Sequence, residues 1–394
     1  MPLQHNCTKR KVPHHKPRLI LFVCYFWVMR IKKIHIQNYK SLVDFELDSP
    51  PPFCAFVGPN ASGKSNIFEA LEFTNYLAVI GFGAFRYDNY RLSDIISFKF
   101  QPDPFFKQGR DPSIKIHYKF EDELQLEIDI VTNKNILSNE IEIDSVGSEV
   151  KPYRLLSILD VLNLEKRKDY LKRWEDRGKH YHKDYEQFID NFSRIFVGKK
   201  HNNSLPEAQN KLSFDASNLS QVIGQVFQNE NKREDFIEWL QILIPEFKNI
   251  EVKQNSLDGK YEFFIYEKHS NQPFPKHLIS DGTYNILALM AAIYQSDEPQ
   301  FLCIEEPENG LHPQAIKLLV EFLRDKCTDE GHHIWLNTHS QTLVRCMEIN
   351  EIVMVNKING ATRAKMASHL QGIKIKTDEA WLSNALGGGV SWSM

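Results

Sequence analysis

The stretch Gly58-Pro59-Asn60-Ala61-Ser62-Gly63-Lys64-Ser65 decides the fold, because it fits the pattern G-x-x-x-x-G-K-[ST]. A short apolar run, Phe53–Val57, comes directly before it and is typical of a strand buried on both faces. The apolar residues of the stretch that follows, Lys64–Leu77, fit a helix. A glycine-rich turn between such a strand and helix directs backbone N–H groups and the positive end of the helix dipole at phosphate oxygens. The sequence therefore predicts a nucleotide-binding loop, called the P-loop below.

Each polar residue of the P-loop has a role in this prediction. The Lys64 ammonium is expected to reach the β- and γ-phosphates, and the Ser65 hydroxyl to bind Mg²⁺. The expected ligands are ATP and Mg²⁺, and the predicted cofactor-binding residues here are Gly58, Pro59, Asn60, Ala61, Ser62, Gly63, Lys64, Ser65 and Asn66. The alternative is a chance match on a glycine-rich turn, and the flanking strand and helix argue against it.

A second apolar run, Phe301–Ile304, predicts a buried strand that ends in two carboxylates, Glu305 and Glu306. A strand that ends in carboxylates beside a P-loop supplies a ligand for Mg²⁺ and a base for the attacking water. We therefore assign Glu305 to the metal shell and Glu306 to general-base catalysis. For an isolated Glu-Glu pair, an ordinary strand-end charge is the better interpretation, so the assignment depends on the P-loop.

The segment Leu278–Thr283 predicts a second anion site. It leads into a helix that Ser280 can cap, and Gly282 would let a phosphate approach the helix N-terminus closely. We expect Ser280, Gly282 and Thr283 to bind the nucleotide across a dimer, closing on the γ-phosphate of the partner subunit. The alternative is a simple helix cap.

His339 follows a third apolar run, Ile334–Asn337, and is placed to contact the γ-phosphate and to sense its loss. A lone histidine at a strand end is more often structural, so this role depends on the other motifs. The predicted catalytic residues are Glu306, His339 and Lys64, and the predicted metal ligands are Ser65 and Glu305.

The order of the predicted elements indicates a core in two parts with an insertion between them. Strand and helix patterns alternate over residues 29–90, which hold the P-loop, and over residues 276–394, which hold the other candidate residues. Residues 91–275 show short alternating segments, such as 113–120, then a charged helical stretch and a hairpin. We predict an α/β P-loop NTPase fold with an antiparallel β lid and an inserted helical subdomain.

Residues 1–28 do not fit this core. Basic residues precede an apolar run, Leu19–Met29, but no small-residue cleavage site follows, and the run is too short to span a membrane. We expect Met29 to be the natural start and residues 1–28 to be upstream sequence; a short hydrophobic anchor is the alternative. The expected use of cytosolic ATP, with Cys54 and Cys303 inside predicted strands, favours a cytoplasmic location without a membrane partner.

The composition is that of a soluble globular protein and excludes the disordered and fibrous classes. The 394 residues include 48 Lys+Arg and 51 Asp+Glu, so the formal net charge is −3. Such a balance gives no general attraction to nucleic acid, and any binding must come from a local patch. The run Lys166-Arg167-Lys168 offers one, although the acidic residues around it favour a solvated, salt-bridged helix.

In this order the motifs resemble the ABC-type ATPase head of the SMC, RecF and OLD-like families. The stretch Glu305–Pro313 (EEPENGLHP) is especially similar to the E-E-P-E-x-x-L-H-P motif of bacterial AAA-type ATPases, and Trp381–Trp392 to the end of their defence-associated members. The resemblance covers residues of about 29–80 and 278–394. It implies the roles given above, with His339 as the switch, Ser280–Thr283 as a signature acting on the partner's nucleotide, and Asn309–Leu311 at the dimer interface.

Two features depart from the family pattern. Ile279 stands where leucine is more usual and Thr283 where many relatives have glutamine. The glutamine loop has no clear position, and Gln101 and Gln108 are the candidates. OLD-like nucleases carry a metal-binding domain after the ATPase, whereas only about 55 residues follow His339 here, so a nuclease would have to be a separate partner.

The resemblance implies an ATPase that forms a homodimer around ATP and acts as the sensor or switch of a partner effector, in bacterial antiphage defence or DNA maintenance. The alternative is a RecF-like DNA repair ATPase that binds DNA directly in an ATP-gated way. A scaffold that binds ATP with negligible turnover is the non-enzymatic interpretation.

Overall fold

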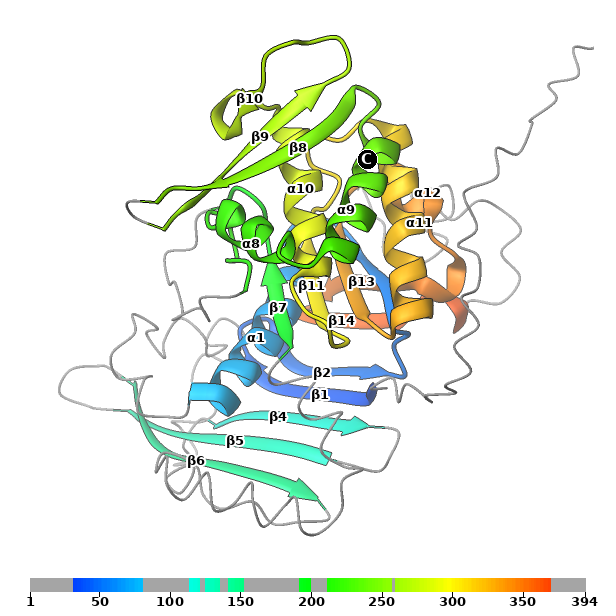
Figure 1. Cartoon of the computed structure of the whole chain (residues 1–394). Coiled ribbons are helices and arrows are strands. Elements are labelled where there is room, and N and C mark those ends of the chain that lie inside the picture. The colour runs from blue at the N-terminus through cyan, green and yellow to red at the C-terminus, as the bar shows by residue number, and fades with distance from the viewer. Residues whose placement is uncertain are drawn as a thin grey trace, which may run out of the picture.

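A computed structural model describes residues 31–80, 113–120, 125–134, 141–151, 191–199, 211–256 and 259–369 of the chain. Within these residues, a six-stranded central sheet has the order β14-β13-β3-β12-β11-β7 (Figure 1). Its strands are β3 (Phe53–Val57), β7 (Phe192–Ile195), β11 (Phe301–Glu305), β12 (His333–Thr338), β13 (Ile352–Ile358) and β14 (Ala361–Met366). All neighbouring pairs except β13–β14 are parallel. The middle strands β3, β12 and β11 are buried at every position, as expected of strands covered on both faces.

The register of this sheet brings the ends of three strands together. Val57 of β3 pairs with Thr338 of β12, and Asn337 of β12 pairs with Glu305 of β11. Parallel strands end at the same edge of a sheet, where open α/β folds bind their ligands. The residues that follow β3, β11 and β12 therefore meet at one edge, although they lie far apart in the sequence.

A second, antiparallel sheet of the described residues has the order β2-β1-β4-β5-β6. It consists of β1 (Ile31–Tyr39), β2 (Leu42–Asp48), β4 (Ser113–Phe120), β5 (Gln125–Lys134) and β6 (Ile141–Lys151). Helix α1 (Lys64–Ile80) packs on it: the Phe73 ring lies 5.5 Å from the Tyr39 ring, and the hydroxyls of Thr74 and Tyr118 lie 3.0 Å apart. The helix of the P-loop thus joins the two sheets (Figure 1).

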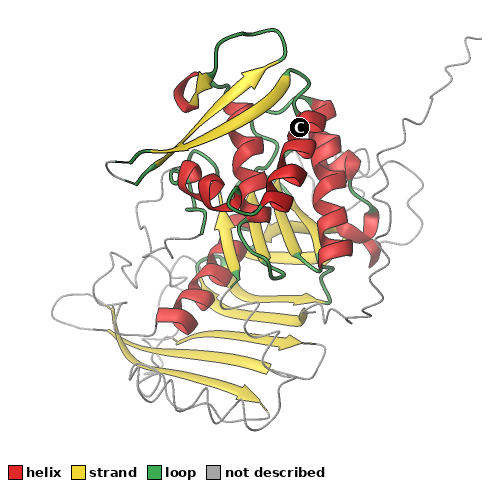
Figure 2. Cartoon of the chain, in the orientation of Figure 1, coloured by secondary structure: helices red, strands yellow, loops and turns green. Residues whose placement is uncertain are grey.

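The other helices cover the central sheet and one another (Figure 2). They are α8 (Leu219–Val226), α9 (Glu230–Leu243), α10 (Asp281–Tyr294), α11 (Pro313–Glu330) and α12 (Gln341–Cys346). Three short 3₁₀ turns lie at Lys276–Leu278, Ile349–Glu351 and Ala367–His369. A small sheet of β8 (Phe247–Gln254), β9 (Tyr261–Glu267) and β10 (Phe274–Pro275) packs against α8 and α9. Helix α10 is buried from Asn285 to Tyr294, so it forms the centre of the helical layer.

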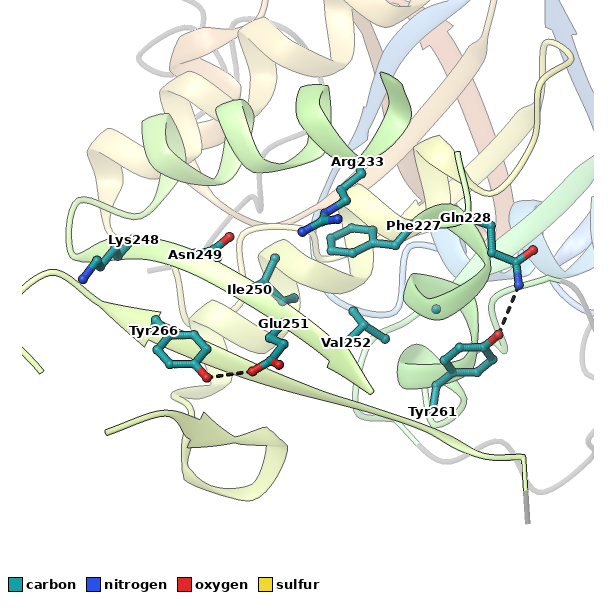
Figure 3. A pocket seen from close by; sticks show the side chains of 11 residues that line it. Phe227, Gln228, Arg233, Lys248, Asn249, Ile250, Glu251, Val252, Tyr261 and Tyr266 are labelled. Carbon is teal, nitrogen blue, oxygen red and sulfur yellow. Dashed lines mark hydrogen bonds between the residues drawn. The ribbon is translucent and has the colours of Figure 1, made fainter. Parts of the chain in front are cut away.

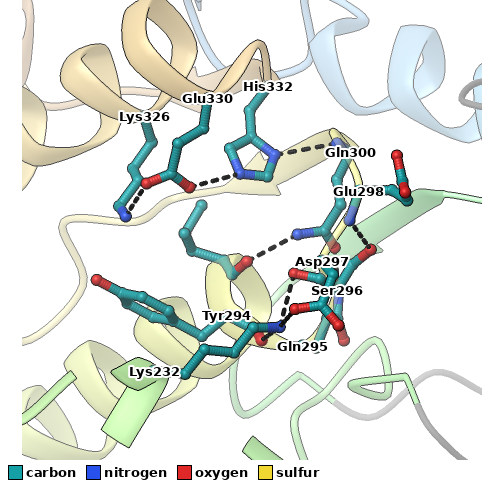
Figure 4. Close-up of polar contacts among 11 residues, drawn as sticks. Lys232, Tyr294, Gln295, Ser296, Asp297, Glu298, Gln300, Lys326, Glu330 and His332 are labelled. Atoms are coloured by element: carbon teal, nitrogen blue, oxygen red, sulfur yellow. Dashed lines mark hydrogen bonds and ion pairs between the residues drawn. The ribbon is translucent and has the colours of Figure 1, made fainter. Parts of the chain in front are cut away.

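A polar network joins α10, α11 and the β11 and β12 strands at the end of the sheet away from the P-loop (Figure 4). The Gln300 backbone N–H donates to His332 Nδ1 over 3.0 Å, and Glu330 contacts both His332 Nε2, at 3.3 Å, and the Lys326 ammonium. Burial would raise the pKa of Glu330, but the hydrogen bonds and charges of His332 and Lys326 lower it to about 2. The network therefore needs an ionised Glu330.

The sequence predicted most of these elements. The strands at 53–57 and 113–120 and the hairpin on both sides of Gly259 are confirmed, and the P-loop helix extends three residues further than expected. Cys54 and Cys303 are free and buried, as expected. Strand β7 and helices α8 and α9 lie within 91–275, yet β7 forms an edge of the central sheet and both helices contribute to the hydrophobic core.

Several expectations concern residues outside the described part of the chain: those on 1–28, the Lys166–Lys168 run, and Gln101 and Gln108. Among the described residues, no helix is both long and apolar enough to span a membrane.

Candidate functional site

Lys64 is the first residue of α1, and its side chain bends back into the P-loop. Its ammonium donates to the carbonyl oxygens of Gly58 and Pro59, both over 2.9 Å, and to Ser62 Oγ over 3.4 Å. The residue is 3% exposed, and burial lowers the pKa of Lys64 to about 8, although the charges of Glu306 and Glu305 oppose the shift. The lysine therefore lies inside the loop that is expected to hold the phosphates.

The outer side of the P-loop is held by residues from β14 and from the β1–β2 turn. Thr362 Oγ1 donates to the Ser62 carbonyl over 2.8 Å and lies 2.6 Å from Ser41 Oγ. Gly63 has φ +100°, and a Cβ there would lie 2.0 Å from Thr362 Oγ1, so this position requires glycine. Asn66, expected among the cofactor-binding residues, donates its side-chain amide to Ser41 Oγ over 2.7 Å. It therefore supports the loop from this side.

Ser65 and Glu305 are in direct contact, which joins the P-loop to the end of β11. Ser65 Oγ donates to Glu305 Oε2 over 2.6 Å. The side-chain amide of Asn337, at the end of β12, donates to Ser65 Oγ over 3.1 Å and to the same Glu305 oxygen over 3.2 Å. The sequence placed Asn337 at a strand end without giving it a role. A polar residue that closes a buried apolar run was the available signal.

The Ser65 and Glu305 side chains fit a magnesium site. Mg²⁺ prefers oxygen ligands, and Ser65 and Glu305 present a hydroxyl and a carboxylate oxygen to the same point. Asn337 turns its amide N–H toward both oxygens, so it holds them in place as a hydrogen-bond donor. In the described part of the chain, no group of three or more His, Cys, Asp or Glu side chains forms another metal site.

Glu306, the candidate base, has an unusual backbone conformation at the end of β11. Its φ is 48°, and its backbone N–H donates to the Asn337 carbonyl over 2.8 Å. A positive φ at a residue other than glycine costs on the order of 1 kcal/mol, so the surrounding contacts have to hold it. The Asn309 side-chain amide donates to Glu306 Oε2 over 3.0 Å. Glu306 is partly exposed at the sheet edge, and Asn309 of its own loop holds its carboxylate.

Glu308 is an acidic residue that the sequence did not single out. Its carboxylate accepts hydrogen bonds from Thr338 Oγ1 and from the His339 backbone, both of which act to lower its pKa. Burial raises the pKa of Glu308 despite these bonds. Glu308 therefore ties the loop after Glu306 to the turn that carries His339.

His339 lies directly after β12 beside the P-loop. Its ring is hydrogen-bonded to the Gly58 backbone, and burial and the nearby Lys64 ammonium lower the pKa of His339. Both effects favour the uncharged form of the ring. Of the predicted catalytic and metal residues, the structure thus brings together Lys64, Ser65, Glu305, Glu306 and His339.

The signature segment, Leu278–Thr283, lies at the N-terminus of α10 and is linked to this site by a loop. Ser280 caps the helix as predicted: its Oγ accepts from the Thr283 backbone over 3.1 Å. Gly282 was expected to make room for a phosphate. The structure gives a different reason for the glycine, because a Cβ there would lie 2.3 Å from the Gly310 carbonyl oxygen. The missing side chain admits the loop that follows Glu306.

A family model described as "AAA domain, putative AbiEii toxin, Type IV TA system" matches residues 53–345, which include every one of these motifs. The chain belongs to this AAA family. It is an ATPase of the ABC/AAA type, and it shares its fold with an SMC head. The predicted fold class and the predicted ATPase activity are therefore confirmed.

The relatives of this AAA ATPase differ in how much of the chain they match. An "ATP/GTP phosphatase" of Helicobacter pylori is 20% identical over 343 residues, which cover 81% of this chain and 87% of that protein. The chromosome partition protein Smc of Methanocaldococcus jannaschii is 48% identical over 46 residues, 12% of this chain and 4% of that protein. A crystal structure of an SMC head bound to the C-terminal winged helix domain of ScpA has a TM-score of 0.54 at 15% identity, covering 85% of this chain and 96% of that chain. This last likeness shows a shared fold.

A separate pocket of about 520 Å³ lies between α8, α9 and the β8–β9 hairpin (Figure 3). Its side chains engage one another: Tyr266 donates to Glu251 over 2.7 Å, and Gln228 donates to the Tyr261 hydroxyl over 3.1 Å. The Arg233 guanidinium lies 5.7 Å from the centre of the Phe227 ring. The pocket has neither a phosphate-binding loop nor paired carboxylates. The candidate site of this ATPase is therefore the sheet edge, which has both.

Proposed function

We propose that this AAA ATPase hydrolyses Mg-ATP at the edge formed by β3, β11 and β12. The P-loop N–H groups and Lys64 would bind the phosphates, and Ser65 and Glu305 would hold Mg²⁺, with Asn337 orienting both side chains. The observation that carries this assignment is the 2.6 Å contact between Ser65 Oγ and Glu305 Oε2, which joins the P-loop to the end of β11. When bound, Mg²⁺ supplies charge neutralisation and orients the phosphates.

Glu306 is the proposed general base. Its carboxylate is partly exposed at the same edge, so it can accept a proton from a water placed in line with the γ-phosphate. His339 lies beside the P-loop, and its ring is the proposed contact to a γ-phosphate oxygen. A neutral imidazole has one N–H, so donation to the phosphate would replace its bond to the Gly58 backbone. Positioning and electrostatic stabilisation are the main means of catalysing phosphoryl transfer, and they need no covalent intermediate.

We also propose that two copies close on two ATP molecules, with the signature segment of each contacting the partner's nucleotide. Ser280 and Asp281 are exposed at the N-terminus of α10, and Leu278 beside them is 61% exposed, which is unusual for a large apolar side chain. The neighbouring Asn309 and Gly310 are exposed as well. A dimer interface here would bury the exposed Leu278 side chain together with these polar neighbours.

The proposed biological role is that of an ATP-driven switch for a partner effector in bacterial antiphage defence or DNA maintenance. The family description names a toxin of a toxin–antitoxin system, and the SMC head with a shared fold was crystallised with a partner domain. Both support an ATPase that acts through another protein. The effector, a nuclease in this proposal, would be a separate chain.

The test is the mass in solution of the Glu306→Gln protein with and without Mg-ATP. Removal of the base should leave nucleotide binding intact and trap the closed dimer, so the mass should double with Mg-ATP. The mass of Lys64→Ala should not change with Mg-ATP, because this variant lacks the ammonium that binds the phosphates. A Glu306→Gln protein that hydrolyses ATP at the wild-type rate would refute the role of Glu306. A protein that stays monomeric with ATP bound would refute the action of the signature segment on a partner's nucleotide.

The alternative is a RecF-like ATPase that binds DNA directly. The support for this alternative is a match to the DNA replication and repair protein RecF of Lactococcus lactis. The match is 42% identical over 45 residues and covers 12% of that protein. Direct binding would give a DNA affinity that depends on ATP and falls steeply with salt. Measuring DNA binding at two salt concentrations separates this function from the switch.

A further inference from the structure

Arg194 is a buried arginine next to the candidate magnesium site. It lies in β7, the strand beyond β11, and its side chain is 7% exposed. Its Nε donates to Glu305 Oε1 over 2.7 Å, and Nη2 donates to the same oxygen. Its Nη1 donates to Glu72 Oε2 over 2.8 Å, and the Phe214 ring lies 5.0 Å from the guanidinium carbon. The guanidinium is therefore held on several sides in one orientation.

The two oxygens of Glu305 have separate partners. Oε1 accepts only arginine N–H groups among the described residues, whereas Oε2 accepts from Ser65 and Asn337. Because the carboxylate is planar, an arginine that holds Oε1 with two N–H groups also sets the direction of Oε2. That direction points to the hydroxyl proposed to bind Mg²⁺.

These contacts form a closed ring that begins and ends on α1. Ser65 and Glu72 are seven residues apart on this helix, two turns along the same face. Ser65 bonds to Glu305, Glu305 to Arg194, and Arg194 back to Glu72. Glu305 is thereby positioned relative to the helix that carries the P-loop lysine and serine, and not only by its own strand.

The charges in the ring support the same role. The Glu305 side chain is 1% exposed, and a buried carboxylate without a partner is strongly unfavourable. The guanidinium pairs with both the Glu72 and the Glu305 carboxylates, so the buried charges compensate one another. An oriented carboxylate oxygen is what a hard cation such as Mg²⁺ requires.

We propose that Arg194 is a positioning residue for Mg²⁺: it directs Glu305 Oε2 toward the metal, so that metal-dependent nucleotide binding depends on strand β7. The inference rests on the proposed assignment of the ATP and magnesium site and adds to it a residue from within 91–275. A purely structural arginine would affect folding without a specific effect on the metal.

The experiment measures binding of a fluorescent ATP analogue to the full chain, first in EDTA and then with rising Mg²⁺. In Arg194→Met, the affinity in EDTA should stay within about twofold of wild type, because the P-loop and Lys64 are unchanged. The Mg²⁺ concentration that gives half of the metal-dependent increase in affinity should rise about tenfold or more. Arg194→Lys should lie between the two, because an ammonium restores the charge without the two-pronged geometry.

Arg324→Met is the matched control. Arg324 makes a similar two-point contact with Glu351, at 2.6 and 2.8 Å, and lies 5.5 Å from the Phe53 ring, but it contacts no candidate site residue. It should lose stability without any shift in the Mg²⁺ midpoint. If Arg194→Met does not fold, Arg194→Lys decides the question, with an expected shift of at least threefold.

Two results would overturn the inference alone: an unchanged Mg²⁺ midpoint in the Arg194 variants, or an equal loss of affinity with and without metal. A wild-type protein that binds no nucleotide would overturn the proposed function, and this inference with it.

Discussion

The main chain of Gly310 lies where a side chain on Gly282 would be. A Cβ on Gly282 would be 2.3 Å from the Gly310 carbonyl oxygen, well inside van der Waals contact. Gly282 belongs to the signature segment and Gly310 to the loop that begins at Glu306, so the proposed trans contact and the proposed base are joined by direct backbone packing. Asn285 of the same helix adds hydrogen bonds to the carbonyls of Pro307 and Asn309, at 3.0 and 2.9 Å.

Substitution of Gly282 is therefore expected to act on catalysis more than on nucleotide binding. In Gly282→Ala the methyl group must displace the Gly310 loop and with it Glu306, so the turnover number should fall about tenfold or more. The affinity for an ATP analogue should change less than threefold, because the P-loop follows β3, whereas the displaced loop follows β11. Steady-state ATPase assays and equilibrium binding measure the two effects separately.

Ala292→Gly is the control for a loss of helix stability. It lies buried in the same helix, away from the loop, and should cost about 1 kcal/mol without lowering turnover at 25 °C. Wild-type turnover in Gly282→Ala would show that the two segments move independently.

Asn285 is expected to hold the same loop through its two donated hydrogen bonds. In Asn285→Leu both bonds are lost and a buried carbonyl is left without its donor, which should destabilise the protein by about 1–3 kcal/mol and lower turnover. Asn285→Asp should be worse, because a carboxylate would then face two carbonyl oxygens. Urea unfolding gives the order of the two variants, and a more stable Asp variant would contradict this account.

Much of this site could be predicted from short stretches of sequence. Each of β3, β11 and β12 is a continuous apolar run, and the polar residues that matter follow directly: the P-loop after Val57, Glu306 after Glu305, and His339 after Thr338. Apolar runs of this kind predict buried parallel strands, and such strands end at a common edge. Local sequence therefore suffices to place these residues on the sheet edge.

Other parts of the site depend on strand order, which a single sequence does not reveal. Arg194 contacts Glu305 only because β7, within the expected insertion, pairs with β11. Asn337 contacts Ser65 because β12 lies between β3 and β11. Gly282 illustrates the same limit. The sequence shows a glycine at this position, but Gly310, which requires it, is 28 positions away, and only the fold shows that the two are in contact.

The lowered pKa of Lys64 predicts a pH dependence of nucleotide binding. Burial lowers the pKa to about 8 in the protein without nucleotide, and phosphate binds the ammonium in preference to the neutral amine. The affinity should therefore be constant below about pH 8 and fall about tenfold per pH unit above it, as expected when binding takes up one proton. Titration of an ATP analogue between pH 7 and 9.5 measures this.

Lys64→Met is the control for this dependence. It should bind weakly at every pH and show no decline above pH 8, since it carries no titrating amine. A wild-type affinity that stays constant up to pH 9.5 would show that Lys64 remains charged throughout.

The Glu330 network predicts how stability changes in acid. The pKa of Glu330 is lowered from its ordinary value of 4.5 to about 2, so its contribution is complete above about pH 4.5 and is lost as the pH falls toward 2. The side chain is 48% exposed, and after solvent screening the contribution is on the order of 1 kcal/mol. Glu330→Gln should therefore be less stable than wild type at pH 6, and the difference should shrink between pH 4.5 and 2.5.

Glu262→Gln, which alters an exposed glutamate of β9, is the control. Its free energy of unfolding, measured with urea, should change with pH in the same way as that of wild type over this range. A Glu330→Gln protein that also runs parallel to wild type would show that the contacts of Glu330 with His332 and Lys326 contribute no pH-dependent stability.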